Sequence, residues 1–156
     1  MIQINEPAPE FVANSVQKGL EKEIKLSDFK GKKIALYFYP KDLTPGCTLQ
    51  AENLRDNFKT LKDKNIVILG VSPDSIKKHM SFIEKKELPF ILISDEDKII
   101  CNLYGVWGEK SFMGKTYEGV NRTTFIIDEN QNVINIIKKP IVKQHSEEVL
   151  KAFSKK

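Results

Sequence analysis

Two nearly continuous apolar runs stand out in the first half of the chain, at residues 33–39 and 65–71. Runs of this kind are typical of strands that are covered on both faces of a sheet. Between them, apolar residues recur at helical spacing and predict an amphipathic helix over residues 45–64, at Ala51, Leu54, Phe58 and Leu61. A strand, a helix and a strand in this order form a βαβ unit with parallel strands and a right-handed crossover.

A second helix is expected directly after the second of these strands. The triplet Ser72-Pro73-Asp74 combines an N-cap residue, a first-turn proline and a favourable acid, which together indicate a helix start. The buried stripe of this helix is formed by Ile76, Met80 and Ile83, and Pro89 closes it. Residues 90–93 then predict a third short strand, and residues 95–104 predict a short helix.

The last third of the chain carries the signal of a β-hairpin. Residues 123–128 and 133–137 flank a polar turn at residues 129–132, and a final helix is predicted near residues 146–153. Residues 108–121 lack a clear period and predict a long loop, a kind of segment that often contributes to functional sites. The order of elements predicts an α/β fold of thioredoxin-like arrangement, with a mixed central sheet flanked by helices and an insertion before the hairpin.

Composition narrows the class of protein. The chain has 156 residues, 40% of them hydrophobic, so we expect residues 1–156 to form a single domain. Its lysines are scattered among acids despite a net charge of +4, and the Lys-rich end at residues 151–156 reads as an exposed helix end, so we expect no nucleic-acid partner. Without a run of about 18 apolar residues we expect no membrane span.

The compartment is predicted from the start of the chain and from its cysteines. Residues 1–9 contain an acid and two prolines where a secretion signal needs a basic start and an apolar run. The two cysteines, Cys47 and Cys101, are too few and too far apart for a disulfide scaffold. We therefore expect a soluble, cytoplasmic protein whose thiols are free.

The segment with the most chemical information is residues 39–48, between the end of a buried strand and the start of a helix. Cys47 would face the unpaired N–H groups and the positive end of the helix dipole, which favour thiolate over thiol, and the thiolate is the nucleophile. A small buried hydrophobic residue is the commoner role of a lone cysteine. Gly46 and Thr48 beside it indicate a strand-to-helix loop rather than a packed face.

Three residues of this segment, Pro40, Thr44 and Cys47, fit the peroxiredoxin pattern Pro-x-x-x-Thr-x-x-Cys with its intervals kept. The wider run at residues 38–56 resembles the peroxiredoxin Q branch, also called bacterioferritin comigratory protein. Residues 104–107 and 122–128 are similar to two other blocks of that branch, so the resemblance covers nearly the whole chain. Arg122 stands at the position of the family's active-site arginine.

The resemblance implies a thiol-dependent peroxidase that reduces hydrogen peroxide and organic hydroperoxides without a cofactor or a metal. Cys47 is the expected nucleophile, because a thiolate must reach one peroxide oxygen while negative charge builds on the other. Thr44 offers a hydroxyl to peroxide or thiolate, Arg122 supplies positive charge and donors, and Pro40 shields the sulfur. The backbone N–H groups of Gly46 and Cys47 are further donors to the substrate. Taken alone, Arg122 would read as a surface salt-bridge residue.

The sequence departs from many relatives in how the oxidised cysteine is recycled. Glu52 stands where they carry a resolving cysteine, and residues 75–86, where others place it, contain none. Cys101 is the remaining possible resolving residue, but it follows two isoleucines on a short apolar helix and reads better as a buried structural cysteine. We therefore expect the sulfenic acid of Cys47 to be reduced by thioredoxin or another outside thiol.

Other functions find less support in the residues. A cysteine hydrolase needs a histidine near Cys47, and the two histidines, His79 and His145, read as surface or cap residues. The scattered Cys and His residues lack metal-ligand spacing, and a Cys-x-x-Cys motif is absent. The remaining alternative is a peroxide sensor or thiol-relay protein without steady turnover. Phe112 and Met113 are expected in core or lid packing, and a monomer is the expected state.

Overall fold

The structure is a computed structural model that describes residues 2–154. Within this range a central sheet holds seven strands in the order β2-β1-β5-β4-β3-β8-β9. Its strands are β1 (Val12–Gln17), β2 (Leu20–Lys25), β3 (Lys33–Phe38), β4 (Ile66–Ser72), β5 (Ile91–Ser94), β8 (Thr123–Ile127) and β9 (Val133–Lys138). The β3–β4 and β4–β5 pairs are parallel and the other pairs are antiparallel, which confirms the predicted mixed sheet.

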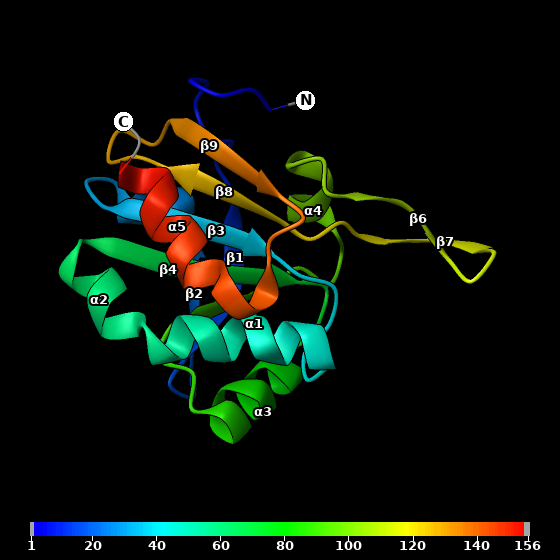
Figure 1. Cartoon of the computed structure of the whole chain (residues 1–156). Coiled ribbons are helices and arrows are strands. Elements are labelled where there is room, and N and C mark those ends of the chain that lie inside the picture. Colours follow the sequence, from blue (N-terminus) through cyan, green and yellow to red (C-terminus); the bar gives the residue numbers. More distant parts are fainter. Residues whose placement is uncertain (1, 155–156) are drawn as a thin grey trace.

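Helices cover both faces of this sheet (Figure 1). They are α1 (Pro45–Asp56), α2 (Phe58–Asp63), α3 (Ile76–Lys86), α4 (Ile99–Leu103) and α5 (His145–Ser154), with 3-10 turns η1 (Leu26–Phe29) and η2 (Val142–Gln144). The first core lies between the sheet and α1, α2, α3 and α5, and includes Tyr37, Cys47, Ala51, Phe82 and Phe153. The second core lies on the other face, against η1 and α4, and includes Leu26, Phe38, Cys101, Tyr104 and Phe125.

Strand β3 shows why its sequence is apolar throughout. Ala35, Tyr37 and Tyr39 point into the first core, whereas Ile34, Leu36 and Phe38 point into the second. Successive side chains of a strand face opposite sides of the sheet, so a central strand covered on both faces needs apolar residues at every position. The predicted βαβ unit is thus present, with α1 and α2 connecting β3 to β4.

Helix boundaries differ from the expected ones in three places. The helix predicted over residues 45–64 is broken at Asn57 into α1 and α2. The side-chain amide of Asn57 donates to the carbonyl of Asn53, a bond that competes with the backbone hydrogen bonds of a continuous helix. Helix α3 begins with Ser75 as N-cap, because Ser72 belongs to β4. The short helix expected over 95–104 is reduced to α4, with the Asp95 carboxylate accepting from the amides of Ile100 and Cys101.

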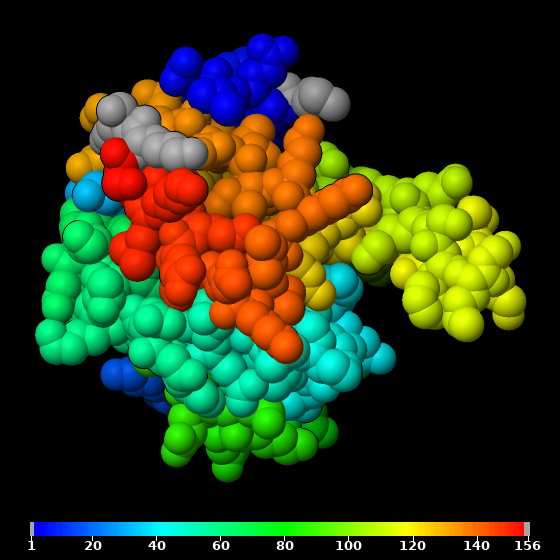
Figure 2. Space-filling model, in the orientation of Figure 1, coloured from blue at the N-terminus to red at the C-terminus, as the bar shows by residue number. Residues whose placement is uncertain are grey.

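The prediction of a loop at residues 108–121 is wrong. This segment belongs to a two-stranded hairpin, β6 (Trp107–Phe112) and β7 (Lys115–Val120), whose turn residues Met113 and Gly114 both have positive φ, as hairpin turns require. Figures 1 and 2 show the hairpin standing away from the body of the molecule. Solvent surrounds most of the hairpin, so its strands lack the apolar alternation by which a half-buried strand is found.

The core packing expected for two residues of the hairpin is also wrong. Phe112 and Met113 are 66% and 87% exposed, so neither packs into a core.

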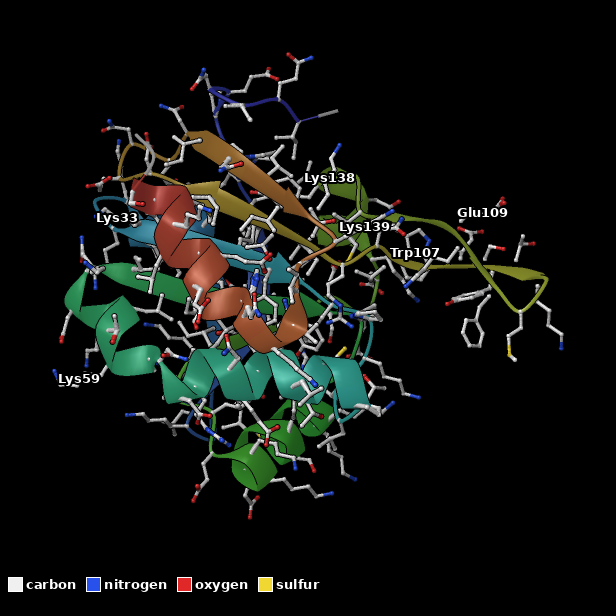
Figure 3. The ribbon with its side chains drawn as sticks, viewed as in Figure 1. Lys33, Lys59, Trp107, Glu109, Lys138 and Lys139 are labelled. Atoms are coloured by element: carbon white, nitrogen blue, oxygen red, sulfur yellow. The ribbon has the colours of Figure 1, made fainter. Side chains whose placement is uncertain are left out.

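Trp107 lies at the base of the hairpin with Glu109 further along it (Figure 3). The Lys98 ammonium group lies 5.6 Å from the centre of the Trp107 ring, a cation–π contact that ties the base of the hairpin to the residue preceding α4.

Candidate active site

Cys47 lies in the first turn of α1, directly after the loop that leaves β3. Thr44 is the N-cap residue and Pro45 opens the helix, a position where the missing N–H of proline costs nothing. The first intrahelical bond runs from the Thr48 amide to the Thr44 carbonyl at 2.8 Å. The amides of Gly46 and Cys47 precede it and have no partner within the helix, as is general for the first turn of a helix.

Arg122 reaches Cys47 from the segment between β7 and β8, at the base of the hairpin. It precedes β8, and its Nη2 atom donates to the Cys47 sulfur at 3.3 Å. The Nη1 atom of the same guanidinium donates to Gln50 Oε1 at 2.7 Å. Gln50 lies three residues after Cys47 on α1, so the two acceptors are on one face of one helix. A fixed cation is therefore held against the sulfur by two bonds.

Gln50 was not identified from the sequence. Its side chain is fully buried, and its Nε2 atom makes no hydrogen bond among the described residues. The spacing of Cys47 and Gln50 contains the signal, because residues three apart share a helix face. Their common partner, Arg122, is 72 residues away from Gln50 in the chain and comes close only in the fold.

The surroundings of Cys47 correct one expectation. We expected a loop position rather than a packed face, but Cys47 is only 2% exposed and belongs to the first core. The sulfur is thus both packed and hydrogen-bonded to a cation.

Thr44, Pro40 and Gly46 surround this turn. The Thr44 hydroxyl donates to the Lys41 carbonyl at 2.8 Å, and a hydroxyl that donates one bond still has lone pairs with which to accept another. Pro40 is half-buried at the end of β3. A Cβ atom added at Gly46 would lie 3.4 Å from Arg122 Nη2, so the glycine leaves room for the guanidinium. The contacts thus bring Cys47, Gly46 and Arg122 together, and Pro40 and Thr44 lie on the loop that precedes them.

Two further groups share the electrostatic field of this site. Burial, with smaller effects from Asp42 and Cys47, raises the pKa of Tyr37 well above its usual value, and its hydroxyl makes no hydrogen bond among the described residues. Burial and the Arg122 cation lower the pKa of Lys110, whose Nζ atom donates to the Val120 carbonyl at 2.9 Å. Lys110 is thus a second cation near Arg122, and it comes from β6.

His79 is not the surface or cap residue that we expected. Its side chain is fully buried, with Nδ1 2.6 Å from Asp42 Oδ2 and Nε2 2.9 Å from the carbonyl oxygen of Ile93. Asp42 also accepts from the Tyr39 hydroxyl at 2.6 Å, and its amide donates to Asp74 at 2.8 Å. Asp42, Asp74 and His79 bring atoms of metal-ligand type within 4.8 Å of one another, but these groups are engaged in the hydrogen bonds just described.

His145 is also buried, against expectation. Its Nε2 atom lies 2.9 Å from the Thr124 hydroxyl, and its Nδ1 atom lies 2.9 Å from Glu148 Oε1. Burial, with a smaller contribution from Arg122, lowers the pKa of this imidazole, although Glu148 acts in the opposite direction. His79 was misread because a polar residue on an amphipathic helix is normally exposed, and its partner Asp42 is 37 residues away in the chain. His145 was expected before the last helix, and its burial beside Thr124 is visible only in the fold.

Cys101 lies in the second core, on the opposite face of the sheet from Cys47. It is fully buried, and burial together with the Asp95 carboxylate raises the pKa of its thiol well above the usual value. A thiol in this environment stays protonated and is a poor nucleophile. Its position matches the structural role that the sequence favoured.

A family model described as AhpC/TSA family matches residues 4–136. The chain belongs to the AhpC/TSA family. Peroxiredoxin Bcp of Escherichia coli (strain K12) is 46% identical over 128 residues, which cover 82% of each chain. Peroxiredoxin Bcp of Bacillus subtilis (strain 168) is 44% identical over 153 residues, covering 97% of this chain and 95% of that protein.

Solved structures of related peroxiredoxins have the same fold. A cysteine-to-serine variant of PrxQ from Xylella fastidiosa superposes with a TM-score of 0.89 at 30% identity, covering 99% of this chain and 96% of the other. A bacterioferritin comigratory protein from Xanthomonas campestris gives a TM-score of 0.84 at 32% identity, covering 92% and 90%. The thioredoxin-like fold and the resemblance to the peroxiredoxin Q branch are confirmed. This peroxiredoxin is a thiol-dependent peroxidase, and its relatives favour the enzyme over the sensor.

No helix within residues 2–154 is both long enough and apolar enough to cross a bilayer.

Proposed function

We propose that Cys47 is the nucleophile of this peroxidase and that Arg122, Thr44, Pro40 and Gly46 complete its substrate site. The observation that carries the proposal is the 3.3 Å contact between Arg122 Nη2 and the Cys47 sulfur. A guanidinium in this position favours the thiolate and remains available to the oxygen on which negative charge develops. Thr44 contributes its hydroxyl, Gly46 contributes its amide, and Pro40 limits the space beside the sulfur.

The proposed reaction has one bond-forming and one bond-breaking event. The Cys47 thiolate attacks the terminal oxygen of the hydroperoxide, an S–O bond forms and the O–O bond breaks. Two electrons pass from sulfur to the peroxide, and the departing hydroxide or alkoxide takes up a proton to leave as water or an alcohol. Cys47 then carries a sulfenic acid. Donors already in place at the departing oxygen lower the barrier because they need no reorganisation during the reaction.

We propose that thioredoxin or another outside thiol reduces the sulfenic acid. Cys101 supports this view because it lies in the other core and its thiol is held in the protonated form. The outside thiol would form a mixed disulfide with Cys47 and release water, and a second thiol would regenerate Cys47. Cys101 then serves the packing of α4 against the sheet rather than the reaction.

We also propose a substrate class, an oligomeric state and a cellular compartment for this peroxidase. The X. campestris relative is described by its alkyl peroxide reduction activity, which supports organic hydroperoxides as substrates here beside hydrogen peroxide. We further propose that residues 1–156 form one domain that acts as a monomer in the cytoplasm.

The first experiment locates the oxidised atom. The protein is treated with one equivalent of hydrogen peroxide and a sulfenic-acid trap, and peptides are analysed by mass spectrometry. We expect the trap on Cys47, and we expect Cys47→Ser to lose peroxide consumption in the presence of thioredoxin or dithiothreitol. Consumption that persists in this variant would exclude Cys47 as the nucleophile. Consumption of a single equivalent per chain without turnover would instead support the sensor.

A second experiment tests the role assigned to Arg122. Arg122→Met should slow oxidation of Cys47 by about a hundredfold, as expected when a charge-stabilising donor is lost. Arg55→Met is the matched control, because Arg55 lies on the same helix as Cys47 but donates to Lys86, away from the sulfur. Equal rates in the two variants would remove Arg122 from the mechanism.

A further inference from the structure

The buried Asp42–His79 pair connects the loop that carries Pro40 and Thr44 to α3. Asp42 sits in the middle of this loop, yet its side chain is only 1% exposed, and that of His79 is fully buried. The ring nitrogen Nδ1 of His79 lies 2.6 Å from Asp42 Oδ2. His79 belongs to α3, so the contact joins the loop to a helix 37 residues further along the chain.

The hydrogen bonds of His79 fix its ring in one orientation. A backbone carbonyl only accepts, so the 2.9 Å contact with Ile93 requires a hydrogen on Nε2. One proton then lies between Nδ1 and Asp42, whichever of the two atoms carries it. Asp42 accepts from the Tyr39 hydroxyl as well, and its amide donates to Asp74. The loop is thereby tied to α3, to β5 and to the residues before α3.

None of these groups belongs to the proposed substrate site, but together they determine where the loop lies. Leu43, which follows Asp42, has a φ of +65°. This conformation costs energy for a residue other than glycine, so it is retained only when neighbouring contacts hold it. The residue after Leu43 is the N-cap of α1. A shift of the loop therefore changes the direction in which the first turn of α1 presents Cys47.

We propose that His79, acting through Asp42, is a positioning residue that holds the first turn of α1 closed over Cys47. The inference rests on the proposed role of Cys47. A closed turn aligns the sulfur with Arg122 for attack on a small peroxide. The same turn hides Cys47, which is 2% exposed, from a bulkier reducing thiol. Loosening the Asp42–His79 pair therefore slows oxidation of Cys47 and speeds its re-reduction.

The decisive variants separate hydrogen bonding from charge. His79→Phe keeps a buried ring and removes both hydrogen bonds. Asp42→Asn is the conservative rescue, since its amide nitrogen donates to Nδ1 of a neutral His79 while its oxygen accepts from Tyr39. Leu26→Ala is the control for lost stability, because Leu26 is fully buried in the second core, away from the loop. If His79→Phe does not fold, His79→Leu, which also removes both hydrogen bonds, replaces it.

Three quantities are measured for each variant. They are the rate of Cys47 oxidation by hydrogen peroxide, the rate at which dithiothreitol reduces the sulfenic acid, and hydrogen exchange at the amides of Asp42 and Thr48. In His79→Phe we expect oxidation to slow by about ten- to a hundredfold, as for a misplaced reacting group, with faster reduction and faster exchange. Asp42→Asn should stay within a few-fold of the wild type. Leu26→Ala should leave the ratio of the two rates unchanged.

Two results would overturn the proposal. One is wild-type rates and exchange in His79→Phe or its substitute. The other is a loss of both rates in equal proportion in His79→Phe and Leu26→Ala, which would reduce His79 to a general stabilising role. If Cys47 of the wild type is not oxidised at all, the proposed function fails, and exchange at Asp42 and Thr48 still decides whether the pair holds the turn.

Discussion

At the scale of single residues, the site depends on one guanidinium that has two acceptors on the same helix. Arg122 donates to the Cys47 sulfur and to Gln50, so the position of the charge is set by an amide that takes no part in the proposed chemistry. The fork of an arginine side chain suits this arrangement, because its donors have a fixed mutual geometry. Gln50 is therefore a residue whose loss should affect the rate through Arg122.

Replacement of Gln50 tests this dependence. Gln50→Met keeps the volume of the side chain and removes the acceptor of Arg122 Nη1. We expect oxidation of Cys47 to slow by about tenfold, because the guanidinium is no longer held in its productive position. The rate is measured with hydrogen peroxide by rapid quenching and mass spectrometry. Glu52→Gln, two residues further along α1, is the control, and an equal effect in both variants would contradict the assignment.

A buried histidine makes a second prediction at this scale. Because burial lowers the pKa of His145, the folded protein favours the neutral ring, whereas the unfolded chain takes up a proton near pH 6.5. The unfolded state therefore binds more protons below that pH, and the free energy of unfolding falls as the pH drops from 7 through 6.5. Thermal unfolding between pH 7 and 5.5 should show this decline, and His145→Gln should flatten it. Parallel curves for the two proteins would refute the assignment.

At the scale of elements, β4 has a glycine, Gly70, at a position where the Tyr37 ring leaves no room for a side chain. A Cβ atom at Gly70 of β4 would lie 2.9 Å from ring atoms of Tyr37 and from a methyl group of Leu92. Real Cβ atoms do not approach this closely, so any other residue at position 70 displaces the layer beneath α1. The same layer contains Cys47, so the packing of β4 also affects the site.

Gly70→Ala is the matching prediction. It should lower the free energy of unfolding by about 1–3 kcal/mol, the usual cost of overpacking a core. Gly108→Ala in β6 is the control, because its added Cβ would meet only Asn121 Nδ2 at an ordinary 3.6 Å. Chemical denaturation measures both variants. A Gly70→Ala protein as stable as the control would mean that the core can relax around the extra methyl group.

The β6–β7 hairpin and the β1–β2 pair are the elements that the hydrophobic pattern failed to predict. Elements with a buried face were found, because burial imposes a period of 2 or 3.6 residues or a continuous apolar run. Strands β1 and β2 were not predicted, since β2 has a single buried position among its six residues. The first helix was predicted as one unit because the apolar period continues across Asn57, while the break depends on a local side-chain hydrogen bond.

At the scale of the whole molecule, the sheet separates the two cysteines. Cys47 packs against one face and Cys101 against the other, so a disulfide between them needs part of the fold to come apart. The arrangement favours a cycle in which a thiol from another molecule, and not Cys101, reduces the sulfenic acid of Cys47.

The corresponding prediction concerns Cys101→Ala. Turnover with thioredoxin or dithiothreitol should stay at the wild-type rate, and mass spectrometry of the oxidised wild type should show no link between Cys47 and Cys101. Loss of turnover in this variant while its folded fraction is unchanged would indicate that Cys101 resolves the sulfenic acid. Cys47→Ser serves as the inactive reference.

The sequence by itself determined the α/β class, the βαβ unit, and the position of Cys47 at a helix start, because these depend on local spacing and on side chains near one another in the chain. Only the tertiary structure decided that Arg122 meets Gln50, that His79 and His145 are buried, and that Cys101 lies behind the sheet. These contacts join residues from separate elements, and a buried polar group is recognisable only when its partner is in place.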